Sequence, residues 1–150
     1  QQGHPGWTIA TDAEIDALPT DRPVWLLGWD NRFLTELKAA GATSARFDIE
    51  TSQRRVTLDD EVHTGLSPVL TARIAGQPVA WVAAATPAAV PGLARKLPHY
   101  GKYGYLVFTG AAPDNQVKGQ WPVGDSRLMH WFVDERPLLK LPARATLTER

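Results

Sequence analysis

The stretch that decides the fold is Val79–Phe108, VAWVAAATPAAVPGLARKLPHYGKYGYLVF. It begins and ends with apolar runs of strand length, Val79–Ala84 and Tyr105–Phe108. The residues between them predict a helix that starts at Thr86-Pro87, a cap followed by proline, and ends at Pro98. A strand, a helix and a strand in this order predict a βαβ unit whose two strands are parallel neighbours. The apolar residues at helical spacing in the helix are Val90, Leu93, Ala94 and Leu97.

The residues before this unit predict another strand and helix. Val24–Leu27 is a short apolar run of strand length. Asp30 or Asn31 can cap a helix from Arg32 to Ala40, and Gly41 stands where a helix C-terminus favours a left-handed residue.

Further short elements are expected along the chain. A capping box that begins at Thr11 predicts a helix over Asp12–Leu18. Alternation of polar and apolar residues in Ala45–Glu50, followed by Val56–Leu58, predicts a hairpin. Val69–Ile74 and Val79–Ala84 predict a second hairpin around Ala75-Gly-Gln-Pro78, and one more strand is expected over Leu128–Val133.

Together these patterns predict one mixed α/β domain over residues 11–136. A mixed sheet forms it, with a parallel βαβ core and antiparallel hairpins, flanked by two or three helices. Residues 1–10 are expected to be a linker or boundary segment, and residues 137–150 a C-terminal tail.

Composition excludes several classes of function. Sixteen basic and sixteen acidic residues give a net charge of zero, which argues against binding to nucleic acid or to anionic membranes. The chain has no cysteine, so thiolate catalysis, disulfides and cysteine-ligated zinc are excluded. No segment approaches the about 20 apolar residues of a membrane-spanning helix, so no membrane insertion is expected.

The chain carries no complete catalytic or metal-binding motif. Gly101-Lys-Tyr-Gly104 comes after a helix, whereas a phosphate-binding loop precedes one, so it favours a helix cap and a tight turn. The four histidines lack the spacing of a zinc site, and Ser126 lies outside any nucleophile elbow. No catalytic residue, no metal ligand and no cofactor are therefore predicted in this chain. An enzyme would have to bring together distant residues, for which the candidates are Asp30, Glu61, His63, Asp125 and His130.

A group of aromatic and polar residues is the candidate binding site. Aromatic side chains provide a large contact area at small entropic cost, which suits recognition of peptides or sugars. The alternative is that the same aromatic rings fill the core, with Trp121 turned inward as an anchor. Tyr105 and Trp131 are considered with this platform, and the candidate binding residues are Tyr100, Lys102, Tyr103, Lys118, Gln120 and Trp121.

Two pieces of sequence resemble a region of bacterial secreted zinc aminopeptidases of the gluzincin type. They are Leu93–Phe108, LARKLPHYGKYGYLVF, and Lys118–Ser126, KGQWPVGDS, with weaker similarity in Val24–Asn31. In that family the region lies in an α/β part outside the catalytic domain. The family's His-Glu-x-x-His signature is missing from this chain, so no catalytic or zinc-binding role passes to any residue.

The resemblance implies a non-catalytic accessory or interaction domain of a periplasmic or secreted metallopeptidase. Its partner would be the catalytic domain of the same polypeptide or another protein, and zinc would belong to that catalytic domain alone. The alternative is a free-standing module that binds peptide or glycan through an aromatic surface.

Overall fold

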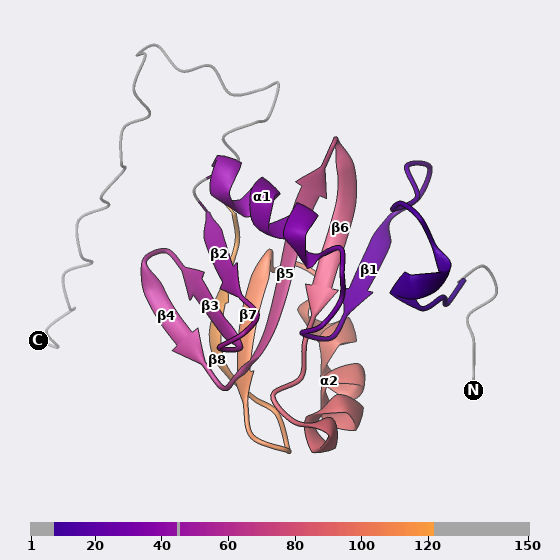
Figure 1. The fold of residues 1–150 in the computed structure, drawn as a ribbon. Coiled ribbons are helices and arrows are strands. Elements are labelled where there is room, and N and C mark those ends of the chain that lie inside the picture. The colour runs from indigo at the N-terminus through magenta and orange to yellow at the C-terminus, as the bar shows by residue number, and fades with distance from the viewer. Residues whose placement is uncertain (1–7, 45, 122–150) are drawn as a thin grey trace, which may run out of the picture.

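The computed structural model describes residues 8–44 and 46–121 and shows a mixed α/β fold with two sheets (Figure 1). This confirms the predicted fold class. The larger sheet has five strands in the order β1-β6-β5-β7-β8, and the smaller sheet has three in the order β2-β3-β4. The strands are β1 (Val24–Leu27), β2 (Phe47–Glu50), β3 (Arg55–Leu58), β4 (Glu61–Thr64), β5 (Ser67–Ile74), β6 (Gln77–Val82), β7 (Tyr105–Thr109) and β8 (Asp114–Gly119).

The two helices lie on opposite faces of the larger sheet (Figure 1). Helix α1 and the smaller sheet cover one face, and α2 covers the other. The helices are α1 (Leu34–Ser44) and α2 (Val90–Lys96), and short 3₁₀ helices are η1 (Asp12–Glu14), η2 (Pro87–Ala89) and η3 (Leu97–Tyr100). Thr86 precedes η2 with Pro87 in its first turn, as the sequence predicts.

The predicted pairing within the βαβ unit is wrong. Strands β6 and β7 point the same way but are not neighbours, because β5 lies between them and pairs antiparallel with both. The parallel neighbour of β6 is β1, with Val24 opposite Val79 and Leu27 opposite Val82. The β5–β6 hairpin forms locally and occupies the position beside β6 that β7 would otherwise take.

Both predicted hairpins, β2–β3 and β5–β6, are confirmed. Two-residue turns set the register of β5–β6 and of a third hairpin, β3–β4. In the β5–β6 hairpin, Ala75 and Gly76 have φ angles of 48° and 86°, which suits the two-residue turn of a twisted hairpin. Asp59 and Asp60 play the same part between β3 and β4, with φ angles of 47° and 69°. Strands β4 and β8 were not predicted, and β8 pairs with β7.

Both predicted N-terminal helices have different bounds. Helix α1 ends at Ser44, so Gly41 is inside the helix and is not its cap. Gly41 is buried there because Phe47 packs against it. Asn31 caps the turn that leads into α1, since its Oδ1 accepts the Phe33 N–H at 3.0 Å and its carbonyl accepts the Leu34 N–H at 3.1 Å.

The helix predicted over Asp12–Leu18 is only the single turn of η1. The Thr11 N–H does donate to Glu14 Oε2, at 2.7 Å, as a capping box requires. Asp12 Oδ2, however, accepts the N–H of Arg32 at 2.8 Å, and Ile15 packs against the core. These tertiary contacts replace further helical turns.

The larger sheet separates two apolar cores. The α1-side core joins α1 and the smaller sheet to one face of the larger sheet, and Trp81 and Val107 are fully buried in it. The α2-side core is smaller, with buried members Val69, Ala89, Leu93, Leu106 and Phe108. Of the apolar positions expected on the helix face, Leu93 is buried and Leu97 partly buried, whereas Val90 and Ala94 are exposed because 3₁₀ turns flank the short helix.

The strand predicted over Leu128–Val133, the tail 137–150 and residues 1–7 lie outside the described residues.

Gly41→Ala is expected to destabilise the fold by about 1–3 kcal/mol through overpacking. An added Cβ would lie 2.5 Å from Cε2 of Phe47 and 2.7 Å from its carbonyl oxygen. Helix propensity alone predicts the opposite, a gain of about 1 kcal/mol. Urea unfolding of the variant decides between the two, and a gain in stability would refute the close packing. Ala42→Gly, at the exposed next position of α1, is the matched control and should cost about 1 kcal/mol.

Candidate functional site

Five of the predicted binding residues gather around one tyrosine ring. The Nζ atoms of Lys102 and Lys118 lie 5.3 and 5.8 Å from the centre of the Tyr103 ring. The rings of Tyr100 and Tyr103 are 5.8 Å apart, and Gln120 Nε2 donates to the Lys102 carbonyl at 2.9 Å. We call these five residues the Tyr103 cluster. Both ammonium groups are within reach of a cation–π interaction with the same ring.

The chain reaches this arrangement through a tight turn and a strand pair. The Tyr103 N–H donates to the Tyr100 carbonyl at 3.0 Å, which closes the turn after η3. The Gly104 N–H donates to the Gly119 carbonyl at 2.8 Å, which extends the pairing of β7 with β8. Segments 100–104 and 118–120, distant in sequence, are therefore held side by side.

Trp121 does not belong to this cluster. Its ring packs 4.6 Å from that of Tyr105 and 5.7 Å from that of Phe47, both on the α1 side of the larger sheet. Its Nε1 donates to the Thr71 carbonyl at 2.7 Å. Trp121 is thus the inward-turned anchor that the sequence analysis gave as an alternative. The described part of the predicted aromatic platform is divided between the two faces of the sheet, and Trp131 lies outside the described residues.

Tyr105 links the two sheets. Its hydroxyl donates to Asp59 Oδ2 at 2.8 Å, in the turn between β3 and β4. Burial first, and then the hydrogen bond to Asp59 and the charge of Asp59, raise the pKa of Tyr105 above its ordinary value of 10.0. The Tyr105 hydroxyl therefore stays protonated and acts as a structural hydrogen-bond donor.

The structure does not bring the described catalytic candidates together. Asp30 follows β1, while Glu61 and His63 lie on one face of β4 in the smaller sheet. His63 Nε2 is buried without a hydrogen-bond partner among the described residues. Asp125 and His130 lie outside the described residues. Within residues 8–44 and 46–121, no three His, Asp or Glu side chains are grouped as metal ligands would be.

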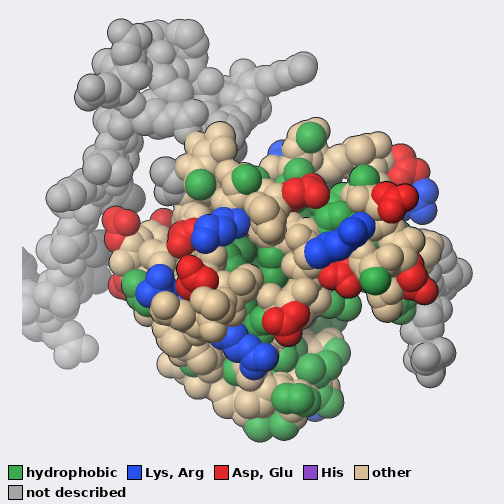
Figure 2. Space-filling model, viewed as in Figure 1, with side chains coloured by type: hydrophobic (Ala, Val, Ile, Leu, Met, Phe, Trp, Pro, Cys, Tyr) green, Lys and Arg blue, Asp and Glu red, His purple; other side chains and the backbone are tan. Residues whose placement is uncertain are grey.

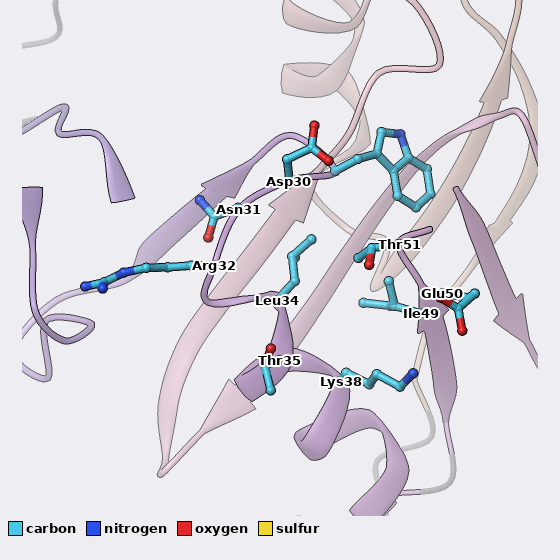
Figure 3. A pocket seen from close by; sticks show the side chains of 10 residues that line it. Asp30, Asn31, Arg32, Leu34, Thr35, Lys38, Ile49, Glu50 and Thr51 are labelled. Atoms are coloured by element: carbon cyan, nitrogen blue, oxygen red, sulfur yellow. The ribbon is translucent and has the colours of Figure 1, made fainter. Parts of the chain in front are cut away.

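A hollow of about 410 Å³ lies between the loop after β1, the start of α1 and the end of β2 (Figure 3). This hollow was not predicted, although a strand, a Gly-Trp-Asp-Asn loop and a helix in this order are the signal for a site at the end of a strand. At its rim, the Glu50 carboxylate already accepts a hydrogen bond from the Ser52 hydroxyl at 2.8 Å. This bond lowers the pKa of Glu50. Arg32 extends away from the other lining side chains in Figure 3. The hollow thus has an apolar floor and a polar rim, but no convergent acid and base.

Strand β1 leaves apolar side chains exposed on the α2 side of the larger sheet. Trp25 is 45% exposed and Leu27 is 63% exposed, opposite Ala80 and Val82 of β6. We call Trp25 and Leu27 the β1 face. The α2-side core is built on β5 and β7, so α2 does not cover this edge. Figure 2, which has the same view as Figure 1, shows acidic and basic side chains interspersed on the side of the molecule where α1 lies.

No family model, curated protein or solved structure matches this chain. The resemblance to zinc aminopeptidases therefore stays a prediction. Among the described residues, no helix has the length and apolar character that crossing a membrane requires.

Trp121→Ala is expected to lower the free energy of unfolding by about 3 kcal/mol, because it removes a packed ring. Trp25→Ala is the matched control, since it removes the same side chain from an exposed position and should cost less than about 1 kcal/mol. Chemical unfolding of both variants measures the difference. Equal losses would contradict the packing described for Trp121.

Stability is expected to fall at alkaline pH through Tyr105. The folded state holds the Tyr105 proton more tightly than the unfolded chain does. Its contribution is complete below the unfolded pKa of about 10 and is lost as pH rises through the higher folded pKa. Tyr105→Phe should cost about 1 kcal/mol at pH 7, and the gap from the parent chain should narrow by pH 11. Urea unfolding at both pH values tests this, and an unchanged gap would refute it.

Proposed function

We propose that this chain is a non-catalytic accessory domain that docks onto the catalytic domain of a periplasmic or secreted bacterial zinc aminopeptidase. The catalytic domain belongs to the same polypeptide in this proposal, and the zinc belongs to that domain. The observation that carries the proposal is the β1 face, where Trp25 is 45% and Leu27 is 63% exposed.

The chemistry of the β1 face suits a protein contact. Exposed edge strands of soluble proteins are usually protected by charge, proline or a covering element. Here the outward side chains of the edge strand are instead tryptophan and leucine. Tryptophan is among the residues that contribute most to binding energy at protein interfaces. A partner that buried these two side chains would exclude water from its contact with β1.

The positions of the resembling pieces also support the proposal. Leu93–Phe108 and the described part of Lys118–Ser126 lie together, because β7 pairs with β8. Val24–Asn31 includes β1 itself, so the β1 face comes from one of these pieces. The similarity in sequence thus falls on one contiguous block and on the strand proposed to dock.

A free-standing peptide- or glycan-binding module is the second candidate function. The Tyr103 cluster favours it, because two adjacent tyrosine rings and two ammonium groups are the chemistry of a polar ligand site.

The intact mass of the native gene product is the first test. Docking in cis predicts a mass far above the 16.5 kDa of this chain, with a His-Glu-x-x-His sequence in the added part. A native product of 16.5 kDa would overturn docking in cis and favour the free-standing module.

The double change Trp25→Ala and Leu27→Ala should weaken the docking of this domain onto the catalytic domain in the full-length product. Hydrogen exchange of β1 amides should be slow in the parent product and faster in the double variant, because the apolar contact is lost. The variant of the 150-residue chain should keep its stability to within about 1 kcal/mol. Val62→Ala, which alters another exposed apolar residue on β4, is the control and should leave exchange of β1 unchanged. Equal exchange in parent and double variant would contradict docking through β1.

A further inference from the structure

The charge of the chain is unevenly distributed. Residues 90–121 contain four Lys and Arg and one acidic residue, Asp114. Residues 8–89 contain seven Lys and Arg and eleven Asp and Glu. The segment from α2 to β8 is therefore cationic within a chain whose net charge is zero.

Two of these cations share one aromatic ring. Lys102 extends from the turn before β7 and Lys118 from β8, and their Nζ atoms lie 5.3 and 5.8 Å from the centre of the Tyr103 ring. The ring attracts each ammonium group, whereas the two like charges repel each other. A carboxylate in contact with either ammonium group would be attracted by both charges and would lessen their repulsion.

The described residues do not supply that anion. The ion pairs among them join Arg22 to Asp21 and Lys38 to Asp48, in other parts of the fold. Asp114 lies opposite Thr109, at the end of β8 away from Lys118. Within residues 8–44 and 46–121, no carboxylate is thus paired with either ammonium group.

The two lysines are also fixed to a common frame. Gln120 Nε2 donates to the Lys102 carbonyl at 2.9 Å, and the Gly104 N–H donates to the Gly119 carbonyl at 2.8 Å. These bonds hold the turn against the end of β8. A site whose backbone is held in place loses less entropy when a ligand binds.

From these observations we infer that the Tyr103 cluster binds a peptide carboxylate through Lys102 and Lys118. The half-buried rings of Tyr100 and Tyr103 pack against an apolar side chain next to that carboxylate. A peptide fits better than nucleic acid, because the acidic remainder of the chain would repel a polyanion. The carboxylate can be a peptide C-terminus or an Asp or Glu side chain, which share this chemistry.

The inference does not depend on the docking proposal, but it rests on the second candidate function and specifies its ligand. The Tyr103 cluster lies beside β8, and the docking face lies on β1, at the other edge of the larger sheet. Peptide binding is measured on the 150-residue chain alone, so failure of one proposal leaves the other standing.

Amide NMR titration of the chain with three short acetylated peptides tests the inference. The first is acetyl-Ala-Ala-Phe with a free C-terminus, the second is its C-terminal amide, and the third is acetyl-Ala-Glu-Phe amide. We expect the free acid or the glutamyl peptide to shift the amides of Lys102, Tyr103 and Gly119, which also identifies the source of the carboxylate. The uncharged amide should bind at least about threefold more weakly, since it cannot pair with the ammonium groups. Equal binding of all three peptides, or no binding at millimolar concentration, would overturn the inference.

Single charge-removing variants provide the matched comparison. Lys102→Gln and Lys118→Gln should each weaken binding of the carboxylate peptide by about threefold to tenfold. Arg95→Gln removes one exposed charge from the same cationic segment outside the cluster and should change binding by less than about twofold. Equal weakening by all three variants would show a diffuse charge effect and refute the site. Tighter binding of inorganic phosphate than of either carboxylate peptide would also refute it. Thermal melts confirm that each variant remains folded.

Discussion

The structure depends on how Trp81 is held at the centre of the α1-side core. Its side chain is fully buried, and its indole N–H donates to the Gly28 carbonyl at 2.8 Å across 53 residues of sequence. The ring of Trp29 meets it edge-on at 5.0 Å. A buried indole N–H requires an acceptor, and here that acceptor is the residue directly after β1. This bond fixes β1 beside β6 and sets where the chain turns towards α1.

The surfaces of the molecule follow from that placement. Side chains of a strand alternate between faces, so Leu26, directed to the α1 side with Trp81, leaves Trp25 and Leu27 on the α2 side. The chain after β1 leads to α1 and the chain after β6 leads to α2, on opposite faces (Figure 1). Because α2 is short and lies over β5 and β7, the β1 edge of its face stays open. An exposed tryptophan on β1 is thus a consequence of burying Trp81.

Local patterns predicted most elements and the pairing of strands close in sequence, but not the pairing of distant strands. Alternation and turn residues were sufficient for the β2–β3 and β5–β6 hairpins, whose contacts are close in sequence. The pairing of β1 with β6 joins distant residues, and no local signal distinguishes it from the expected β6–β7 pairing. Gly41 is typical of a helix end, but a helical glycine is also what the close approach of Phe47 requires. In the site, segments 100–103 and 118–120 were identified by residue type, whereas the direction of Trp121 depends on packing against Phe47 from another sheet.

The two edges of the larger sheet differ in the force that would drive binding. At β1 the exposed groups are apolar, so association there would depend on burial and would change little with salt. Beside β8 the exposed groups are ammonium ions over a tyrosine ring, so association there would weaken as salt screens the charges. The three central strands separate these edges, and they contribute the buried residues Trp81, Leu70 and Val107. If both proposals hold, one edge of the sheet would contact the catalytic domain while the other would remain accessible to a peptide carboxylate.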